Sequence, residues 1–140
     1  MLRKTSTFIF MVLMVFAVFT AGKAQYFKAN PETAYEYIVG NKIESGIKIE
    51  KYTFALNDNL FHVSHYFKLN HEPSALTRFL QNHRLIQSYD DAIWYTNDIS
   101  TVFDEEIKKE DVVEGYENDS PRNDWLLVLN GYTTSYFVFN

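Results

Sequence analysis

The hydrophobic pattern at the beginning of the chain differs from the pattern that follows. Arg3 and Lys4 precede an uninterrupted apolar run at residues 8–19, and mostly small residues continue to Ala24. Positive, apolar and small segments in this order are typical of a secretory signal peptide. We therefore expect residues 1–24 to be a signal peptide.

The length of the apolar run favours release over a membrane anchor. About 12 to 14 apolar residues span about 20 Å as a helix, whereas the hydrocarbon core is ~30 Å thick. Gly22 and Ala24 are small residues of the kind that signal peptidase requires, so we expect cleavage after Ala24 and a periplasmic or secreted protein that starts at Gln25. The alternative is an uncleaved N-terminal anchor, which would be the protein's one membrane contact.

Alternating and continuous apolar segments predict two β-hairpins. Residues 47–56 and 60–69 alternate on either side of a polar turn at 57–59. In the second strand one set of side chains should point inward: Phe61, Val63, His65, Phe67 and Leu69. The other set should point outward: Leu60, His62, Ser64, Tyr66 and Lys68. Residues 125–130 and 135–140 are almost continuously apolar, which predicts a closing hairpin in the centre of the sheet.

Helical spacing of apolar residues predicts the remaining elements. Prolines suited to a first helical turn open predicted helices at 31–40 and 73–87, and a third helix is expected at 98–107. A short strand is expected at 92–96, and residues 110–124 read as an exposed loop. Together these elements predict a single α+β domain over residues 25–140, with an antiparallel sheet of about four to five strands covered on one face by two to three helices.

Negative charge is concentrated in one third of this domain. Residues 25–140 have 18 acidic but only 10 basic side chains, and 90–124 alone have 12 acidic and 3 basic. This balance argues against nucleic acid and anionic lipid as partners. The chain has no cysteine. Because small exported domains of oxidising compartments often carry disulfides, that absence favours a bacterial protein.

Motifs for cofactors and metals are missing from the sequence. No glycine-rich phosphate loop, HExxH helix or calcium loop is present. His62 and His65 are close in sequence, but residues three apart on a strand point to opposite faces, so we expect no metal site there and no cofactor.

Two titratable residues are candidates for acid or base chemistry. His83 falls on the apolar stripe of the helix predicted at 73–87, and Glu106 lies beside apolar residues of the helix predicted at 98–107. A buried imidazole or carboxyl has a perturbed pKa and suits general acid or base catalysis. The competing interpretation, which we favour, is a hydrogen-bonded core or rim histidine and an exposed glutamate.

Aromatic residues complete the candidate site. Residues 25–140 include 10 Tyr, 8 Phe and 2 Trp, and tyrosine is enriched at recognition surfaces. We predict an acidic, tyrosine-bearing binding surface formed by nine residues: Trp94, Tyr95, Asp104, Glu105, Glu106, Glu110, Asp111, Tyr116 and Tyr132. Tyr136 is a further aromatic residue expected near it.

Three hypotheses for function follow. The first is a small exported binding or inhibitor-type protein, similar in character to immunity proteins, that recognises a basic protein partner; opposite charge would steer their association. The second is a small hydrolase or isomerase-like enzyme with a pocket between helix and sheet. The third is a structural envelope protein without a dedicated ligand. The charge distribution favours the first over an enzyme, and the sequence leaves the oligomeric state open.

Overall fold

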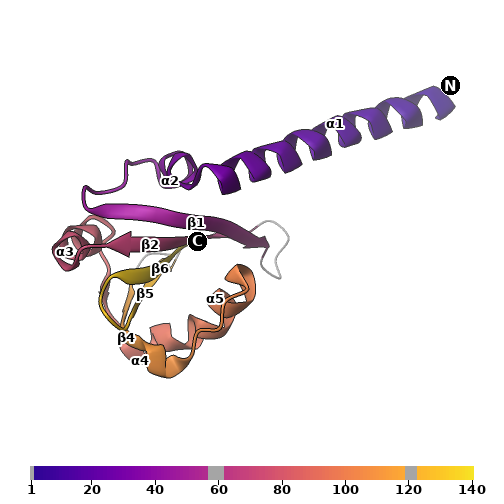
Figure 1. Ribbon diagram of the computed structural model, residues 1–140. Coiled ribbons are helices and arrows are strands. Elements are labelled where there is room, and N and C mark those ends of the chain that lie inside the picture. The colour runs from indigo at the N-terminus through magenta and orange to yellow at the C-terminus, as the bar shows by residue number, and fades with distance from the viewer. Residues whose placement is uncertain (1, 57–61, 119–122) are drawn as a thin grey trace.

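A six-stranded antiparallel sheet organises the domain. The computed structural model describes residues 2–56, 62–118 and 123–140. The strands are β1 (Ile47–Leu56), β2 (Val63–His71), β3 (Ile86–Gln87), β4 (Val112–Glu117), β5 (Trp125–Leu129) and β6 (Thr134–Phe139). Their order in the sheet is β1-β2-β6-β5-β4-β3 (Figure 1). The α+β class is confirmed, both predicted hairpins form, and β5 and β6 occupy the predicted central positions. The turn predicted at 57–59 and Leu60 and Phe61 lie outside the described residues.

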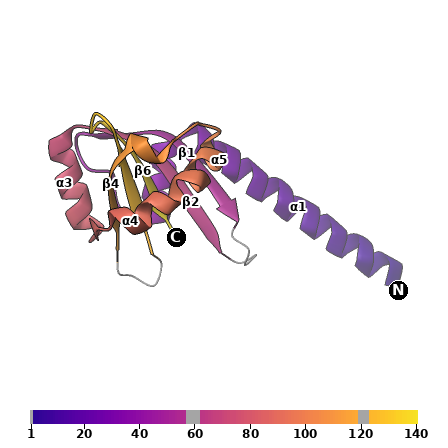
Figure 2. The same ribbon diagram turned by 90° about the horizontal axis from the view of Figure 1, so that it is seen from below.

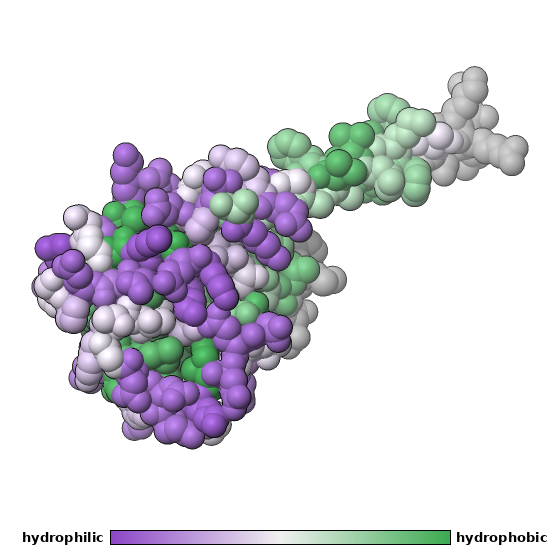
Figure 3. Space-filling view, viewed as in Figure 1, coloured by the Kyte–Doolittle hydropathy of each residue, from purple (hydrophilic) through white to green (hydrophobic). Residues whose placement is uncertain are grey.

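A long helix, α1 (Leu2–Ala29), extends away from the domain. Its apolar side chains at residues 8–19 are exposed, and Figure 3 shows it as a hydrophobic rod beside a largely hydrophilic body. Within the described residues, Thr7–Ala29 is long and apolar enough to cross a membrane, a test that signal sequences also pass. The predicted cleavage site after Ala24 therefore falls inside α1.

Only the last turn of α1 belongs to the domain's core. Phe27 is 9% exposed and packs among core side chains, whereas every other residue of the two core clusters lies further along the chain. Residues 25–140 thus retain all the described core residues, and we expect them to fold without residues 1–24.

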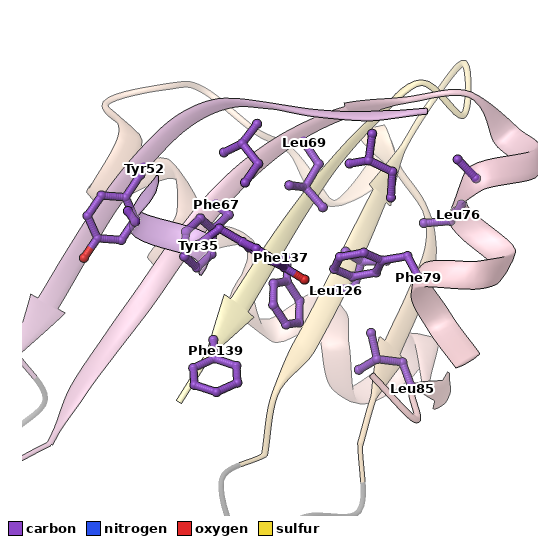
Figure 4. Close-up of a cluster of buried hydrophobic side chains, with 14 of the residues drawn as sticks. Tyr35, Tyr52, Phe67, Leu69, Leu76, Phe79, Leu85, Leu126, Phe137 and Phe139 are labelled. Carbon is purple, nitrogen blue, oxygen red and sulfur yellow. The ribbon is translucent and has the colours of Figure 1, made fainter. Parts of the chain in front are cut away.

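One face of the sheet, called the first face, is covered by α2 (Pro31–Val39) and α3 (Pro73–Asn82). Pro31 and Pro73 stand in the first turns of these helices, where proline does not interrupt a backbone hydrogen bond. Figure 4 shows Tyr35 of α2 and Phe79 of α3 among strand side chains that include Phe67 and Phe137. This cluster is the larger of the two cores.

The opposite face, called the second face, is covered by α5 (Thr96–Phe103). Ile99 is fully buried against Tyr66, Trp125 and Tyr136, and Figure 2 shows α4 (Tyr89–Ala92) and α5 crossing the sheet. We expected helices on one face only, and about four to five strands. The alternating strands carry large apolar residues on both sides, so both faces require a cover.

Three segments differ from their predicted structure. The prediction of a strand at 92–96 is wrong, because Ile93–Tyr95 form a 3₁₀ helix, η1. The helix expected at 73–87 ends at Asn82, and the positive φ of Arg84 (53°) turns the chain back so that Leu85 enters the core. The exposed loop expected at 110–124 is also wrong over much of its length. There, a second 3₁₀ helix, η2 (Lys109–Asp111), leads into β4, which pairs with β5.

Candidate functional site

Most of the net negative charge of residues 25–140 lies on one continuous unit of the fold. Residues 89–111, called the acidic segment, contain eight acidic and two basic residues. The chain passes outward through α4, η1 and α5 and then returns through η2 to β4. Ser100 of α5 links the outgoing part of this segment to the returning part, because its hydroxyl donates to the carbonyl of Ile107 and accepts from the amide of Ile107. The acidic segment is therefore a single surface layer over the second face of the sheet.

Trp94 is the most exposed aromatic residue of this layer. It lies in η1 and is 70% exposed. The Lys109 ammonium of η2 lies 4.4 Å from the centre of the indole ring. This contact is a cation–π interaction, in which the negative face of the ring attracts a cation. Trp94 therefore already has the geometry with which an aromatic residue receives a basic group.

The acidic segment also presents exposed carboxylates. They include those of Asp90, Asp98, Asp104, Glu106 and Glu110. Asp104 ends α5 in the left-handed conformation, with φ of 53°. Glu106 is 83% exposed at its side chain and lies 3.6 Å from Lys108. Glu106 follows the end of α5 rather than lying on it, so the buried carboxyl required for acid catalysis is not formed.

Glu105 has a different role from its two neighbours. Its side chain is 21% exposed, and its carboxylate accepts from Lys51, Lys68 and the hydroxyl of Tyr136. Burial works to raise the pKa of Glu105, but these three hydrogen bonds outweigh it and lower the pKa to about 2. Burial raises the pKa of Tyr136 well above its usual range, and its bond to Glu105 adds to this. Glu105 is an internal ionic link between the acidic segment and the sheet.

Asp111 also has a structural role. Its carboxylate accepts the amide of Lys108 at 2.9 Å and thereby caps η2. Its carbonyl accepts the amide of Asn130 at the end of β5. Glu105 and Asp111 were predicted as binding residues, and the structure instead places both in contacts that hold the acidic segment on the sheet.

The predicted tyrosines do not gather on one surface. Tyr95 belongs to the acidic segment, and its ring stacks on Trp125 of β5 with ring centres 4.1 Å apart. Tyr116 of β4 packs against the first-face core and donates to Glu114 at 2.6 Å. Burial raises the pKa of Tyr116, and the bond to Glu114 adds to this. Tyr132 is 44% exposed in the turn between β5 and β6. Only Tyr95 is thus part of the layer that carries Trp94.

A polar cleft opens beside the acidic segment on the second face. It has a volume of about 290 Å³. Seven residues line it: His62, Ser64, Tyr66, Tyr95, Asp98, Trp125 and Asn140. Burial raises the pKa of Tyr66, and the negative charge of Asp98 adds to this, as expected for an acidic group next to a phenol. We call this site the polar cleft.

Sequence reasoning missed most of the polar cleft. The alternation of His62, Ser64 and Tyr66 indicates that they share a face, but η1 and α5 complete the site from a distant part of the chain. Asp98 was not among the predicted site residues; it lies in the first turn of α5 and is exposed. Asn140 was not considered as a site residue.

A second cavity is an open apolar groove of about 590 Å³ on the first face. Its lining includes Phe27, Tyr52, Phe54, His65 and Phe139. His65 bonds to the Tyr52 hydroxyl at 2.9 Å, and burial raises the pKa of Tyr52 to about 12. Part of the wall, Thr20, Lys23 and Ala24, belongs to the predicted signal peptide. Without that segment the groove loses one side.

The predicted acid and base candidates do not converge on a pocket. His83 follows the last turn of α3, where its Nε2 contacts the Tyr35 hydroxyl at 2.6 Å and its ring packs against Phe79 and Phe137. Glu106 lies on the opposite side of the sheet. Neither residue lines the polar cleft or the apolar groove. His83 is a hydrogen-bonded rim histidine, the interpretation that we favoured from the sequence.

Metal ligands are not gathered anywhere in the described part of the chain, where no group of three or more His, Asp or Glu side chains is placed to hold an ion. His62 lines the polar cleft on the second face, whereas His65 lines the apolar groove on the first. Comparison of the chain with models of protein families, with curated proteins and with solved structures finds no match.

Proposed function

We propose that this chain is an exported protein that binds a basic protein partner through the acidic segment, with Trp94 at the centre of the contact. Export is supported by the N-terminal pattern and by the apolar, exposed α1, and we place cleavage after Ala24 and the mature protein in the periplasm or outside the cell.

The observation that carries the proposal is an exposed tryptophan within a strongly acidic layer. Tryptophan is the residue type most enriched among energetically dominant interface positions, and it is normally buried when it has no partner. Trp94 is 70% exposed and already accepts the cation of Lys109 on its ring. Opposite charge accelerates encounter with a basic partner, and an arginine or lysine of that partner would extend the same cation–π contact.

The test is an affinity capture with residues 25–140 from the envelope and secreted fractions of the source organism. A triple variant replaces Asp104, Glu106 and Glu110 with their amides. These three carboxylates are exposed, so their replacement should leave the fold intact. Glu105 and Asp111 are kept because they hold the acidic segment in place.

A matched variant controls for net charge. Glu32, Glu36 and Glu72 are also exposed but lie near α2 and α3, on the other side of the sheet. Their replacement by glutamine removes the same charge. We expect one basic protein to be captured by the native chain and by the control, and about tenfold less of it by the acidic-segment variant. Equal capture by both triple variants, or capture of no basic protein, would refute the proposal.

A further inference from the structure

The polar cleft contains a charged side chain. Among the described residues that line it, Asp98 is the only Asp, Glu, Lys or Arg. Glu105 is paired with two lysines and Glu106 with one. Among the described residues, by contrast, no cation forms an ion pair with Asp98. The cleft thus presents an exposed carboxylate that forms no ion pair within the described part of the chain.

One wall of the cleft is formed by Asn140, which is fixed by hydrogen bonds. The amide of Asn140 donates to the Asp124 carboxylate, its side-chain nitrogen donates to the carbonyl of Asn123, and its side-chain oxygen accepts from Ser64 at 2.6 Å. Asp124 is itself buried and fixed by three hydrogen bonds with Asn118. A site whose polar groups are already oriented loses little entropy when a ligand binds.

Aromatic rings form the remaining walls. Tyr95 stacks on Trp125, and the Tyr66 ring meets the edge of Trp125 with centres 6.3 Å apart. The Tyr95 hydroxyl is positioned by a bond from Asn123 at 3.2 Å. Aromatic faces and phenolic oxygens beside a carboxylate attract cations through both the ring quadrupole and hydrogen bonds.

We propose that the polar cleft receives an arginine side chain of the basic partner, with its guanidinium against Asp98. This inference rests on the proposed function and adds to it a specific site and a residue type. The volume of about 290 Å³ lies at the lower end of the ~300–1,000 Å³ typical of small-molecule sites, which suits a side chain better than a larger ligand.

Arginine fits the cleft better than lysine does. Its guanidinium is planar, donates five hydrogen bonds in fixed directions and stacks on aromatic rings, whereas an ammonium is a compact, strongly hydrated charge. The cleft supplies acceptors from different elements, including the Asp98 carboxylate, the Tyr66 hydroxyl and the side-chain oxygen of Asn140. A forked donor can reach several of them at once.

The test uses small probes and does not need the partner. Labelled residues 25–140 are titrated with acetyl-arginine-amide and, separately, with acetyl-citrulline-amide, while amide chemical shifts are followed by NMR. Citrulline has the shape of arginine without its charge. We expect weak binding of the arginine probe, shifts centred on Tyr95, Asp98 and Asn140, and at least fivefold weaker binding of citrulline. Equal binding of both probes, or shifts elsewhere, would overturn the inference.

Two variants separate this inference from the proposed function. Asp98→Asn should weaken the arginine probe at least fivefold, while Glu36→Gln, which removes an exposed carboxylate of α2 on the first face, should leave it unchanged. If Asp98→Asn captures the basic partner as well as the native chain does, the cleft is not the arginine site and the proposed function still stands. If the arginine probe binds as expected but no basic protein is captured, the proposed function fails and the cleft remains a guanidinium site.

Discussion

At the scale of single residues, three consecutive acidic side chains have three different environments. Asp104 is exposed and ends a helix, Glu105 is bonded to two lysines and a tyrosine, and Glu106 is 83% exposed at its side chain. Composition treats them as one charged run. Their consequences for stability should therefore differ, although their chemistry is almost the same.

Replacing Glu105 with glutamine should destabilise the domain by about 1–2 kcal/mol, because Lys51 and Lys68 lose their shared carboxylate and Tyr136 loses a charged acceptor. Urea unfolding of residues 25–140 measures this. Glu106→Gln is the matched control and should change stability by less than about 0.5 kcal/mol, since that side chain is exposed. Equal stability of the two variants would show that the Glu105 link contributes nothing.

Replacing Trp94 with alanine should separate binding from stability. The indole is 70% exposed, so the thermal midpoint should barely change, whereas affinity for the captured partner should fall about 30-fold, as for a central interface residue. Calorimetric titration of the captured partner gives the affinity. Tyr37→Ala removes another exposed ring, from α2, and should leave affinity unchanged. A similar loss in both variants would remove Trp94 from the contact.

At the scale of elements, the sequence predicted best where the hydrophobic period was unambiguous. The strand predicted at 47–56 has the same bounds in the structure, and β5 and β6 lie in the centre of the sheet because their apolar residues fill both faces. The short run at 92–96 gave no such signal, since a few apolar residues fit a strand or a helix equally. Tertiary packing of Tyr95 on Trp125 selects the helical form.

The strand β4 was not predicted from the sequence, because polar residues interrupt the apolar alternation that identifies a strand. Residues 112–117 carry two glutamates and a glycine, and a register shift between Val112 and Glu114 breaks the alternation. Irregular pairing of this kind is a β-bulge, which turns side chains out of the regular order. The error mattered for the site, because it placed Tyr116 in an exposed loop rather than against the first-face core.

The candidate site was predicted in part for a similar reason. Charge density along the chain identified the acidic segment, and Trp94 with it. The polar cleft is lined by residues of β2, η1 and α5 and by Asn140. These parts are distant in sequence, and no local sequence pattern indicates that they lie side by side in the fold. Nor does the sequence distinguish a carboxylate in an ion pair, such as that of Glu105, from one that forms no ion pair among the described residues, such as that of Asp98.

The last turn of α1 yields a prediction about the domain boundary. Phe27 packs in the core at 9% exposure, while its neighbour Tyr26 is 54% exposed. In residues 25–140, Phe27→Ala should therefore cost about 3 kcal/mol, because it leaves a cavity over β1, whereas Tyr26→Ala should cost little. Urea unfolding compares them. If both variants are as stable as the native domain, the fold begins after α1.

At the scale of the whole molecule, the sheet separates two cores that contain different titratable groups. His65 and His71 lie on the first face, where burial lowers the pKa of both imidazoles. His71 is buried with its Nε2 against the Ser135 hydroxyl at 2.6 Å. Glu105 lies on the second face, with its pKa lowered to about 2. Lowering the pH should therefore destabilise the two faces in different ranges: the first face when its histidines are protonated, and the second face at lower pH, when Glu105 is protonated.

Acid unfolding should proceed through two ranges of pH. Since the pKa of each buried histidine is lower in the folded state than the usual 6.5, the unfolded chain binds protons more readily. Stability is then full above about pH 6.5 and falls as the pH drops below it. The contribution of Glu105 to stability is present above the pKa of 4.5 that it has in the unfolded chain, and it is lost as the pH falls toward 2.

Urea unfolding at pH 7, 5.5, 4 and 3 should thus show an early and a late decrease in the free energy of unfolding as the pH is lowered. The double variant His65→Gln and His71→Gln, if folded at pH 7, should lose the early decrease, and Glu105→Gln should lessen the late one. A native stability that stays constant between pH 7 and 5 would show that the histidines are equally easy to protonate in the folded and unfolded chain.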